Sequence, residues 1–126
     1  MTYGEEAPKP LRWIGASRDD LRAFPESVRR RVGGALWDAQ LGGKAPYAKP
    51  LKGFGGASVL EIVDDFDGNT YRAVYTVKFA HAVYVLHAFQ KKAKRGIATP
   101  KSEIELIEQR LKRAKADYEQ WQKSAK

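Results

Sequence analysis

The sequence predicts an α+β fold in which two N-terminal helices pack on an antiparallel β-sheet and a long helix follows at the C-terminal end. Three observations support this prediction. Apolar residues recur at helical spacing over residues 18–41 and again after residue 99, and between them strand-like segments are joined by short turns. At 126 residues, the chain has the length of one domain, expected over residues 11–123, after a flexible lead-in over residues 1–10.

The N-terminal third is expected to hold a short strand and a helical hairpin. Residues 11–14 are strand-like, and Ser17 is placed to cap a first helix, with acidic residues in its first turn. Pro25 ends that helix, and a second helix then runs to Gly42. Its apolar residues repeat at helical spacing: Val28, Val32, Leu36 and Ala39.

The middle of the chain is expected to form an antiparallel meander. The strand-like segments cover residues 59–63, 70–77 and 83–90, and they are rich in β-branched and aromatic side chains. Asp67-Gly68 is a strong hairpin signal, because these residues tolerate the positive φ angles of a tight turn. The order of elements is therefore β-α-α-β-β-β-α.

Thr99 and Pro100 mark the start of the C-terminal helix, since Thr can cap it and Pro suits its first position. An apolar stripe follows at spacings of three and four residues: Ile104, Ile107, Leu111, Ala114, Tyr118 and Trp121. A helix of about 22 residues is about 33 Å long, whereas a strand of about eight residues spans about 27 Å. The first half of the helix is therefore expected to pack on the sheet. Residues 118–121 would lie over the N-terminal helices or meet a partner.

Basic charge is concentrated in residues 68–102. The formal net charge of the chain is +8, and this stretch has no acidic residue and seven basic ones: Arg72, Lys78, Lys91, Lys92, Lys94, Arg95 and Lys101. Because strand-forming residues run through the stretch, the sequence indicates a rigid surface that binds a polyanion. Nucleic acid is the first partner to consider, ahead of an acidic protein and an anionic membrane surface. Lys49 and Lys52, in the Gly-rich link before the sheet, can approach from the other side.

Several kinds of chemistry are excluded by what the sequence lacks. There is no cysteine, so neither a disulfide nor a thiolate metal site can form. Phosphate-binding loops, dinucleotide fingerprints and nucleophile-elbow motifs are missing, and two histidines with scattered carboxylates do not suggest a metal site. No cofactor is expected. The polar, acidic N-terminus is unlike a secretory signal and no apolar run approaches membrane-spanning length, so we expect a cytoplasmic protein without a membrane partner.

Arg72 lies in the middle of a strand, where an arginine is either paired with an acid or presented to a ligand. Glu61 can share its face, so an ion pair and a functional role are both open and can coexist. On the last strand, His87, Phe89 and Lys91 share one face. His87 suits proton transfer or a structural role, and Phe89 suits the core or stacking on a base. The other face would carry Leu86, Ala88, Gln90 and Lys92.

An RNA-cleaving site built from such residues needs no metal ion. The 2′-hydroxyl of the RNA attacks the adjacent phosphate, and a base removes its proton. Arginine and lysine side chains stabilise the charge that builds on the phosphoryl oxygens.

Three phrases resemble one toxin family: Tyr-Arg-Ala-Val-Tyr at residues 71–75, Val-Leu-His-Ala-Phe-Gln-Lys-Lys at residues 85–92, and Lys-Arg-Gly-Ile-Ala-Thr-Pro at residues 94–100. They are similar to the HigB-like, phage-derived branch of the RelE/ParE superfamily, over about residues 11–111. The resemblance implies the RelE-like fold and a toxin of a type II toxin-antitoxin system. Such a toxin is an endoribonuclease that cleaves mRNA, commonly on the ribosome. Its cognate antitoxin is usually a helix-turn-helix DNA-binding protein.

The resemblance also implies roles for single residues by their position. Arg72 corresponds to the mid-strand basic residue of the family, Lys52 to the basic residue after the Pro-Leu phrase, and Phe89 to the aromatic residue near the end of the last strand. The expected catalytic residues are Arg72, Lys91, Lys92 and His87. The expected RNA-binding residues are Lys52, Phe89, Lys94 and Arg95. The general base stays open between His87 and a lysine, because the chain continues into a helix where many relatives have a tyrosine or histidine pair.

Two other functions fit the same resemblance. One is a ParE-like inhibitor of a topoisomerase (gyrase) without nuclease activity, and the other is a non-catalytic RNA-binding module. One fold supports all three, so the fold cannot decide between them. The basic cluster over residues 89–95 favours RNA.

Overall fold

The computed structural model describes residues 7–92 and 99–124, so most of the expected lead-in lies outside the described residues. The elements are, in order, β1 (Leu11–Trp13), α1 (Ser17–Arg22), α2 (Glu26–Gln40), β2 (Lys49–Pro50), β3 (Val59–Phe66), β4 (Asn69–Thr76), β5 (Val83–Lys92) and α3 (Lys101–Ser124). The predicted α+β class is confirmed. The two-residue β2 is an addition, because a Lys-Pro pair carries no strand signal.

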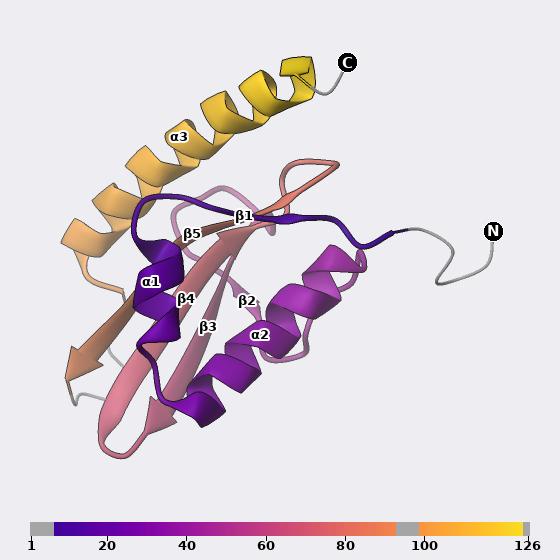
Figure 1. Cartoon of the computed structure of the whole chain (residues 1–126). Coiled ribbons are helices and arrows are strands. Elements are labelled where there is room, and N and C mark those ends of the chain that lie inside the picture. The colour runs from indigo at the N-terminus through magenta and orange to yellow at the C-terminus, as the bar shows by residue number, and fades with distance from the viewer. Residues whose placement is uncertain (1–6, 93–98, 125–126) are drawn as a thin grey trace.

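A five-stranded sheet in the order β1-β5-β4-β3-β2 forms the middle layer. Helices α1 and α2 cover one face and α3 covers the other (Figure 1). Strands β3, β4 and β5 pair antiparallel, as expected, and the added β2 pairs antiparallel with β3, but β1 runs parallel to β5. Its register is held by Val83 N–H, which donates to Pro10 O (3.0 Å), and by Ile14 N–H, which donates to Val85 O (3.1 Å). The sheet is therefore mixed rather than wholly antiparallel.

The predicted hairpin between β3 and β4 is confirmed. Its two-residue turn is Asp67-Gly68, with φ angles of 52° and 80°. Two positive φ angles give the turn a twist that matches that of the flanking strands. This turn sets the register of β3 against β4, and with it the position of Arg72 opposite Val63.

The two predicted helix caps are wrong for a shared physical reason. Helix α1 has no side-chain cap, and Ser17 Oγ instead donates from a buried position to Val85 O (3.1 Å). At α3 the Pro100 carbonyl, placed before the helix, accepts the N–H of Ile104 (3.0 Å), while the Thr99 hydroxyl bonds to a side chain of the sheet. Acceptors shielded from water need a protein donor, whereas helix ends in solvent can use water.

Each face of the sheet has its own apolar core. On the α1 and α2 side, the four apolar residues predicted for the second helix are all buried against β3, β4 and β5. On the opposite side, all six residues of the α3 stripe belong to the second core or pack against it. Within the stripe, Ile107 and Ala114 are fully buried. The stripe is thus used along its whole length within the domain.

The C-terminal end of α3 does not lie over the N-terminal helices, which corrects that expectation. The ring of Tyr118 stacks on Phe79 with centroids 4.8 Å apart, and its hydroxyl accepts the N–H of His81 (3.2 Å). Trp121 packs under the guanidinium of Arg12, 5.0 Å from the ring centroid. The connection between β4 and β5 carries Phe79 past the ends of the strands, and so extends the surface on which a long helix can pack.

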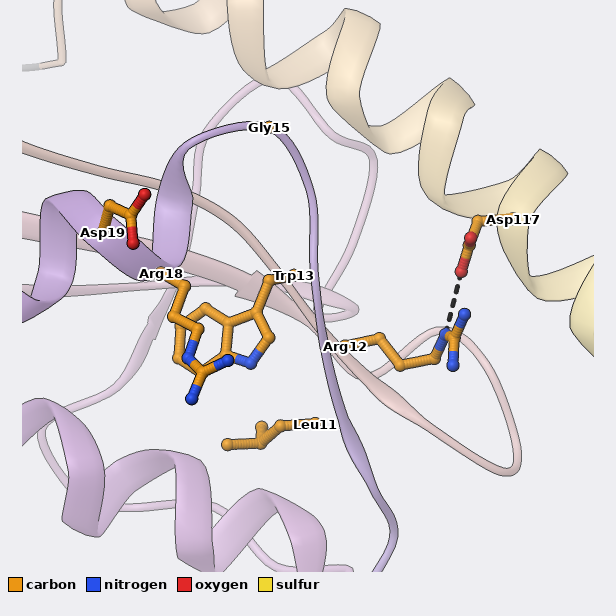
Figure 2. Close-up of a pocket in the computed structure, with 7 residues that line it drawn as sticks. All are labelled: Leu11, Arg12, Trp13, Gly15, Arg18, Asp19 and Asp117. Atoms are coloured by element: carbon orange, nitrogen blue, oxygen red, sulfur yellow. Dashed lines mark hydrogen bonds and ion pairs between the residues drawn. The ribbon is translucent and has the colours of Figure 1, made fainter.

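A polar cluster fastens this half of α3 to the sheet. Arg12 Nε lies 2.9 Å from Asp117 Oδ2, and the Tyr84 hydroxyl donates to the same oxygen (2.6 Å). Figure 2 shows the Arg12–Asp117 bond crossing from β1 to α3. The hydrogen bonds from Arg12 and Tyr84 hold the pKa of Asp117 below its usual range. Burial, together with the bond to Asp117, raises the pKa of Tyr84.

We expect Asp117→Asn to lower the free energy of unfolding at neutral pH by less than about 1 kcal/mol, because the pair is partly exposed and screened. A lowered carboxyl pKa stabilises the fold above the unfolded-state pKa of about 3.9, and this contribution is lost as the pH falls through the lower folded-state pKa. Urea unfolding of both proteins at about pH 7 and at about pH 3 measures the effect. The difference between them should shrink in acid, and a constant difference would contradict the assignment.

Candidate functional site

The α3 side of the sheet carries three cross-strand rows of side chains at the end near the β3–β4 turn. Residues directly opposite in an antiparallel pair share a face. The rows, read across β3, β4 and β5, are Asp65, Thr70 and Lys91; then Val63, Arg72 and Phe89; then Glu61, Val74 and His87. Lys49 of β2 extends the third row, because it pairs with Glu61. The register thus gathers four of the eight candidate residues on one surface: Arg72, His87, Phe89 and Lys91.

Arg72 is the centre of this surface and is only 7% exposed. Its Nη1 lies 3.3 Å from Glu61 Oε2 and 3.4 Å from Thr99 Oγ1. Thr99 Oγ1 in turn donates to Glu61 Oε2 (3.2 Å). The cross-strand ion pair is therefore present, on the diagonal between neighbouring rows. Because both partners are largely buried, the guanidinium is held in a fixed orientation.

A pocket of about 490 Å³ opens beside this ion pair. It lies between residues 49–52, the side chains of β3 and β4 in the first two rows together with Glu61 of the third, and the start of α3. Its lining residues are Lys49, Pro50, Leu51, Lys52, Glu61, Val63, Asp65, Thr70, Arg72, Thr99 and Ile104. Lys49 and Lys52 are exposed at its rim and Arg72 is at its base, so three cations meet around one cavity. A volume of this size is typical of a site for a small molecule or a nucleotide.

His87 is held by both of its ring nitrogens. Nδ1 lies 3.2 Å from Arg110 Nη1, and Nε2 lies 2.9 Å from Glu103 Oε1. Since arginine is only a donor, Nδ1 accepts and the proton resides on Nε2, which donates to Glu103. Arg110 Nη1 also donates to Leu86 O (2.9 Å). This geometry gives His87 a structural task, the attachment of β5 to α3, whether or not it takes part in chemistry.

Phe89 lies directly opposite Arg72 and stacks on His87, with ring centroids 4.6 Å apart and an interplanar angle of 21°. It is 8% exposed, so little of its ring faces solvent. The expected shared face of His87 and Phe89 is confirmed. Leu86 was expected on the other face and is instead buried in the core under α3. A β-bulge between Val85 and His87 inserts one residue into β5 and shifts the alternation of faces.

The remaining candidate residues divide between the described and the undescribed parts of the chain. Lys91 is exposed on β5, opposite Thr70. The backbone of Lys92 pairs with Asn69, but its side chain lies outside the described residues. Lys94 and Arg95 also lie outside them. The pocket adds three residues that the sequence did not place at the site: Asp65, Thr70 and Thr99. It also includes Lys49, which was expected to approach the binding surface, and Glu61, which was considered as the partner of Arg72.

The described residues, 7–92 and 99–124, contain no cluster of three or more histidine or carboxylate side chains suited to a metal ion. Over the same residues, none of the helices has the length and apolar character needed to span a membrane.

A second pocket of about 430 Å³ lies at the opposite edge of the sheet (Figure 2). Its cations are Arg12 and Arg18, and its acids are Asp19 and Asp117, so positive and negative side chains are equal in number. Arg12 is committed to the bond with Asp117. The pocket at Arg72, with three cations against two acids, is better suited to an anionic ligand.

Comparison with known proteins identifies the family. Residues 19–112 match one family model, described as Phage derived protein Gp49-like (DUF891). Because this match covers most of the chain, the protein belongs to the phage-derived Gp49-like family. No curated protein shows significant sequence similarity to it.

Solved structures identify the fold. A double arginine-to-alanine mutant of the Escherichia coli toxin RelE, in the free state, matches with a TM-score of 0.51 and 19% identity, covering 85% of this chain and 98% of the RelE chain. The isolated E. coli RelE toxin matches with a TM-score of 0.50 and 20% identity, covering 80% and 97%. The RelBE2 toxin-antitoxin complex of Mycobacterium tuberculosis gives a TM-score of 0.43 at 20% identity, covering 69% and 95%. The two RelE matches show that the fold is that of the RelE toxins, and the family model confirms the expected phage-derived family.

Proposed function

We propose that this protein is the toxin of a type II toxin-antitoxin system, and that it cleaves mRNA on the ribosome at the Arg72 pocket. The observation that supports the proposal most is the setting of Arg72. A largely buried guanidinium, fixed by an acid and a hydroxyl, faces a pocket with two lysines at its rim. Planar guanidinium groups bind phosphate through two parallel hydrogen bonds, and lysines add charge.

The reaction we propose is attack of an RNA 2′-hydroxyl on the adjacent phosphorus. A P–O bond forms to the 2′-oxygen and the P–O bond to the 5′-oxygen of the next nucleotide breaks, leaving a 2′,3′-cyclic phosphate. Arg72, with Lys49 and Lys52, stabilises the charge on the phosphoryl oxygens. Glu61 is the carboxylate at the pocket wall that can take the 2′-hydroxyl proton, and a lysine ammonium can supply the proton to the leaving 5′-oxygen.

The proposed partners follow from the resemblance to the toxin family. They are mRNA, the ribosome and a cognate antitoxin of the helix-turn-helix DNA-binding type, and the proposed location is the cytoplasm. The net charge of +8 supports both an RNA ligand and an acidic partner surface.

The test is to add purified protein to translating ribosomes and to map the 5′ ends of the mRNA fragments. The proposal expects discrete cuts inside translated codons. Arg72→Ala should lose these cuts. Its matched control is Arg113→Ala, which removes an equally charged but exposed arginine of α3 that does not line the pocket. Inhibition of gyrase supercoiling without any RNA cuts would favour the topoisomerase inhibitor instead.

We expect Lys91→Ala to weaken RNA binding and to make it less dependent on salt. Each lost phosphate contact to a single strand lowers the slope of log K against log [salt] by about 0.7. Lys78→Ala is the control, because Lys78 is also exposed but follows the far end of β4 from Thr70 and Lys91. Fluorescence titrations of a labelled single-stranded RNA at several salt concentrations give the slopes. Equal slopes for both variants and the wild type would show that Lys91 does not contact the RNA.

A further inference from the structure

The Arg72 pocket has an acidic end that phosphate binding does not explain. Asp65 and Thr70 line it one row away from Arg72, about 7 Å along the strand. Thr70 is only 5% exposed, and its hydroxyl donates to Asp65 Oδ1 (2.7 Å). Unlike Glu61, which contacts Arg72, Asp65 is not in an ion pair with any described residue. Asp65 is exposed, and its carboxylate is held by this hydroxyl with no cationic partner among the described residues. Such a carboxylate repels a phosphate group, so this end of the pocket suits another part of a nucleotide.

The surface between the two ends is apolar. Val63 lies between Glu61 and Asp65 on the same face of β3, and it is 37% exposed. Leu51 and Ile104 line the same pocket. Nucleobases have apolar faces that pack on such side chains and polar edges that form hydrogen bonds. The pocket therefore offers cations for a phosphate, an apolar wall for the face of a base, and a carboxylate for its edge.

We propose that the Asp65 end of the pocket is a nucleobase subsite that selects guanine. This inference rests on the proposed action of the protein on RNA. Guanine has two neighbouring donors on its Watson–Crick edge, N1–H and N2–H, which can bond to the two oxygens of a carboxylate. Adenine and cytosine each offer one amino group beside an acceptor, and uracil offers one N–H between two carbonyl groups. Each carboxylate oxygen has two lone pairs, so the bond from Thr70 leaves Oδ1 able to accept again.

The first test measures the affinity of the intact protein for each of the four nucleoside 3′-monophosphates by NMR chemical-shift titration. The wild type should bind 3′-GMP roughly five- to a hundredfold more tightly than the other three, the range that a bidentate base contact provides. Asp65→Asn should remove this preference, because the amide nitrogen of asparagine is a donor and would face one of the two N–H donors of guanine. Arg72→Ala should weaken all four nucleotides to a similar extent, since it acts on the phosphate. Four equal affinities in the wild type would overturn the subsite.

The matched control is Asp64→Asn, which removes the same charge from the next residue of β3. Asp64 pairs with Tyr71, on the opposite face of the sheet. This variant should keep the preference for 3′-GMP, whereas loss of the preference in both variants would mean that net charge, not the subsite, causes it. Thr70→Val separates the positioning of Asp65 from its contact with the base, because it removes the hydroxyl that holds Asp65 but leaves the carboxylate. It should reduce the preference only in part.

Maps of mRNA cuts separate this inference from the proposed function. The subsite predicts guanine at one fixed position next to the cut, enriched in the wild type and in Asp64→Asn but not in Asp65→Asn. Cuts without any base preference, together with equal nucleotide affinities, would contradict the subsite and leave the nuclease intact. Selective binding of 3′-GMP without cuts would support the subsite and contradict the nuclease.

Discussion

Replacement of Arg72 by alanine is expected to lower the rate of mRNA cleavage about 10²- to 10³-fold, the range for removal of one group that stabilises charge in a transition state. Arg72→Lys should recover only part of this loss, because a lysine carries the charge but not the planar pair of donors. Single-turnover cleavage of a short RNA, or of mRNA on stalled ribosomes, gives the rates. A rate for Arg72→Ala within a factor of three of the wild type would exclude this arginine from the reaction.

The fold of the variant must be measured as well, because Arg72 is paired with Glu61 in a largely buried setting. Loss of Arg72 leaves the Glu61 carboxylate with the Thr99 hydroxyl as its one donor among the described residues, and such an unpaired charge destabilises a protein. Adding Glu61→Gln to Arg72→Ala removes that charge. Circular dichroism and thermal unfolding of the single and the double variant then separate a folded, inactive protein from an unfolded one.

The fold was predictable because its main signals are local in sequence. The Asp67-Gly68 pair defines the hairpin by its own φ preferences, and the apolar stripe of α3 defines which face is buried. The direction of β1 was not predictable, because a three-residue strand has no signal for parallel or antiparallel pairing. Its direction is set by contacts with β5, at register positions more than 70 residues away in sequence (Leu11 with Val83).

The candidate site was predictable only where strand alternation holds. Alternation correctly brought Arg72 and Glu61 to one face of the sheet, and it correctly gave His87 and Phe89 a shared face of the last strand. It failed at Leu86, because one inserted residue reverses the faces and no residue type in the sequence identifies a bulge. Thr99 was interpreted as a helix cap, and its bond to Glu61 was missed because the two residues are 38 positions apart in sequence. Asp65 was not a candidate from the sequence, because its place in a pocket depends on residues 49–52 and on the start of α3.

The identity of the general base leads to the second large effect. Both ring nitrogens of His87 are engaged, Nδ1 by Arg110 and Nε2 by Glu103, so the ring has no lone pair directed at the pocket. Glu61 is largely buried, lines the pocket and lies 3.3 Å from the group proposed to bind the phosphate. A carboxylate in this position can accept the proton of a 2′-hydroxyl next to a phosphate that Arg72 holds. The geometry therefore favours Glu61 over His87 as the proton acceptor.

We expect Glu61→Gln to lower the cleavage rate about 10²- to 10⁴-fold, the usual contribution of a general base. The amide keeps the shape of the side chain and can still accept from Thr99, so RNA affinity should change little. Glu103→Gln is the matched control: it removes an equal charge from the same face but from the partner of His87. Glu103→Gln and His87→Gln should both cleave RNA at close to the wild-type rate. A loss of rate in His87→Gln that matches the loss expected for Glu61→Gln, with Glu61→Gln itself close to the wild type, would assign the proton to the histidine instead, and would require its ring to leave Arg110 or Glu103 during the reaction.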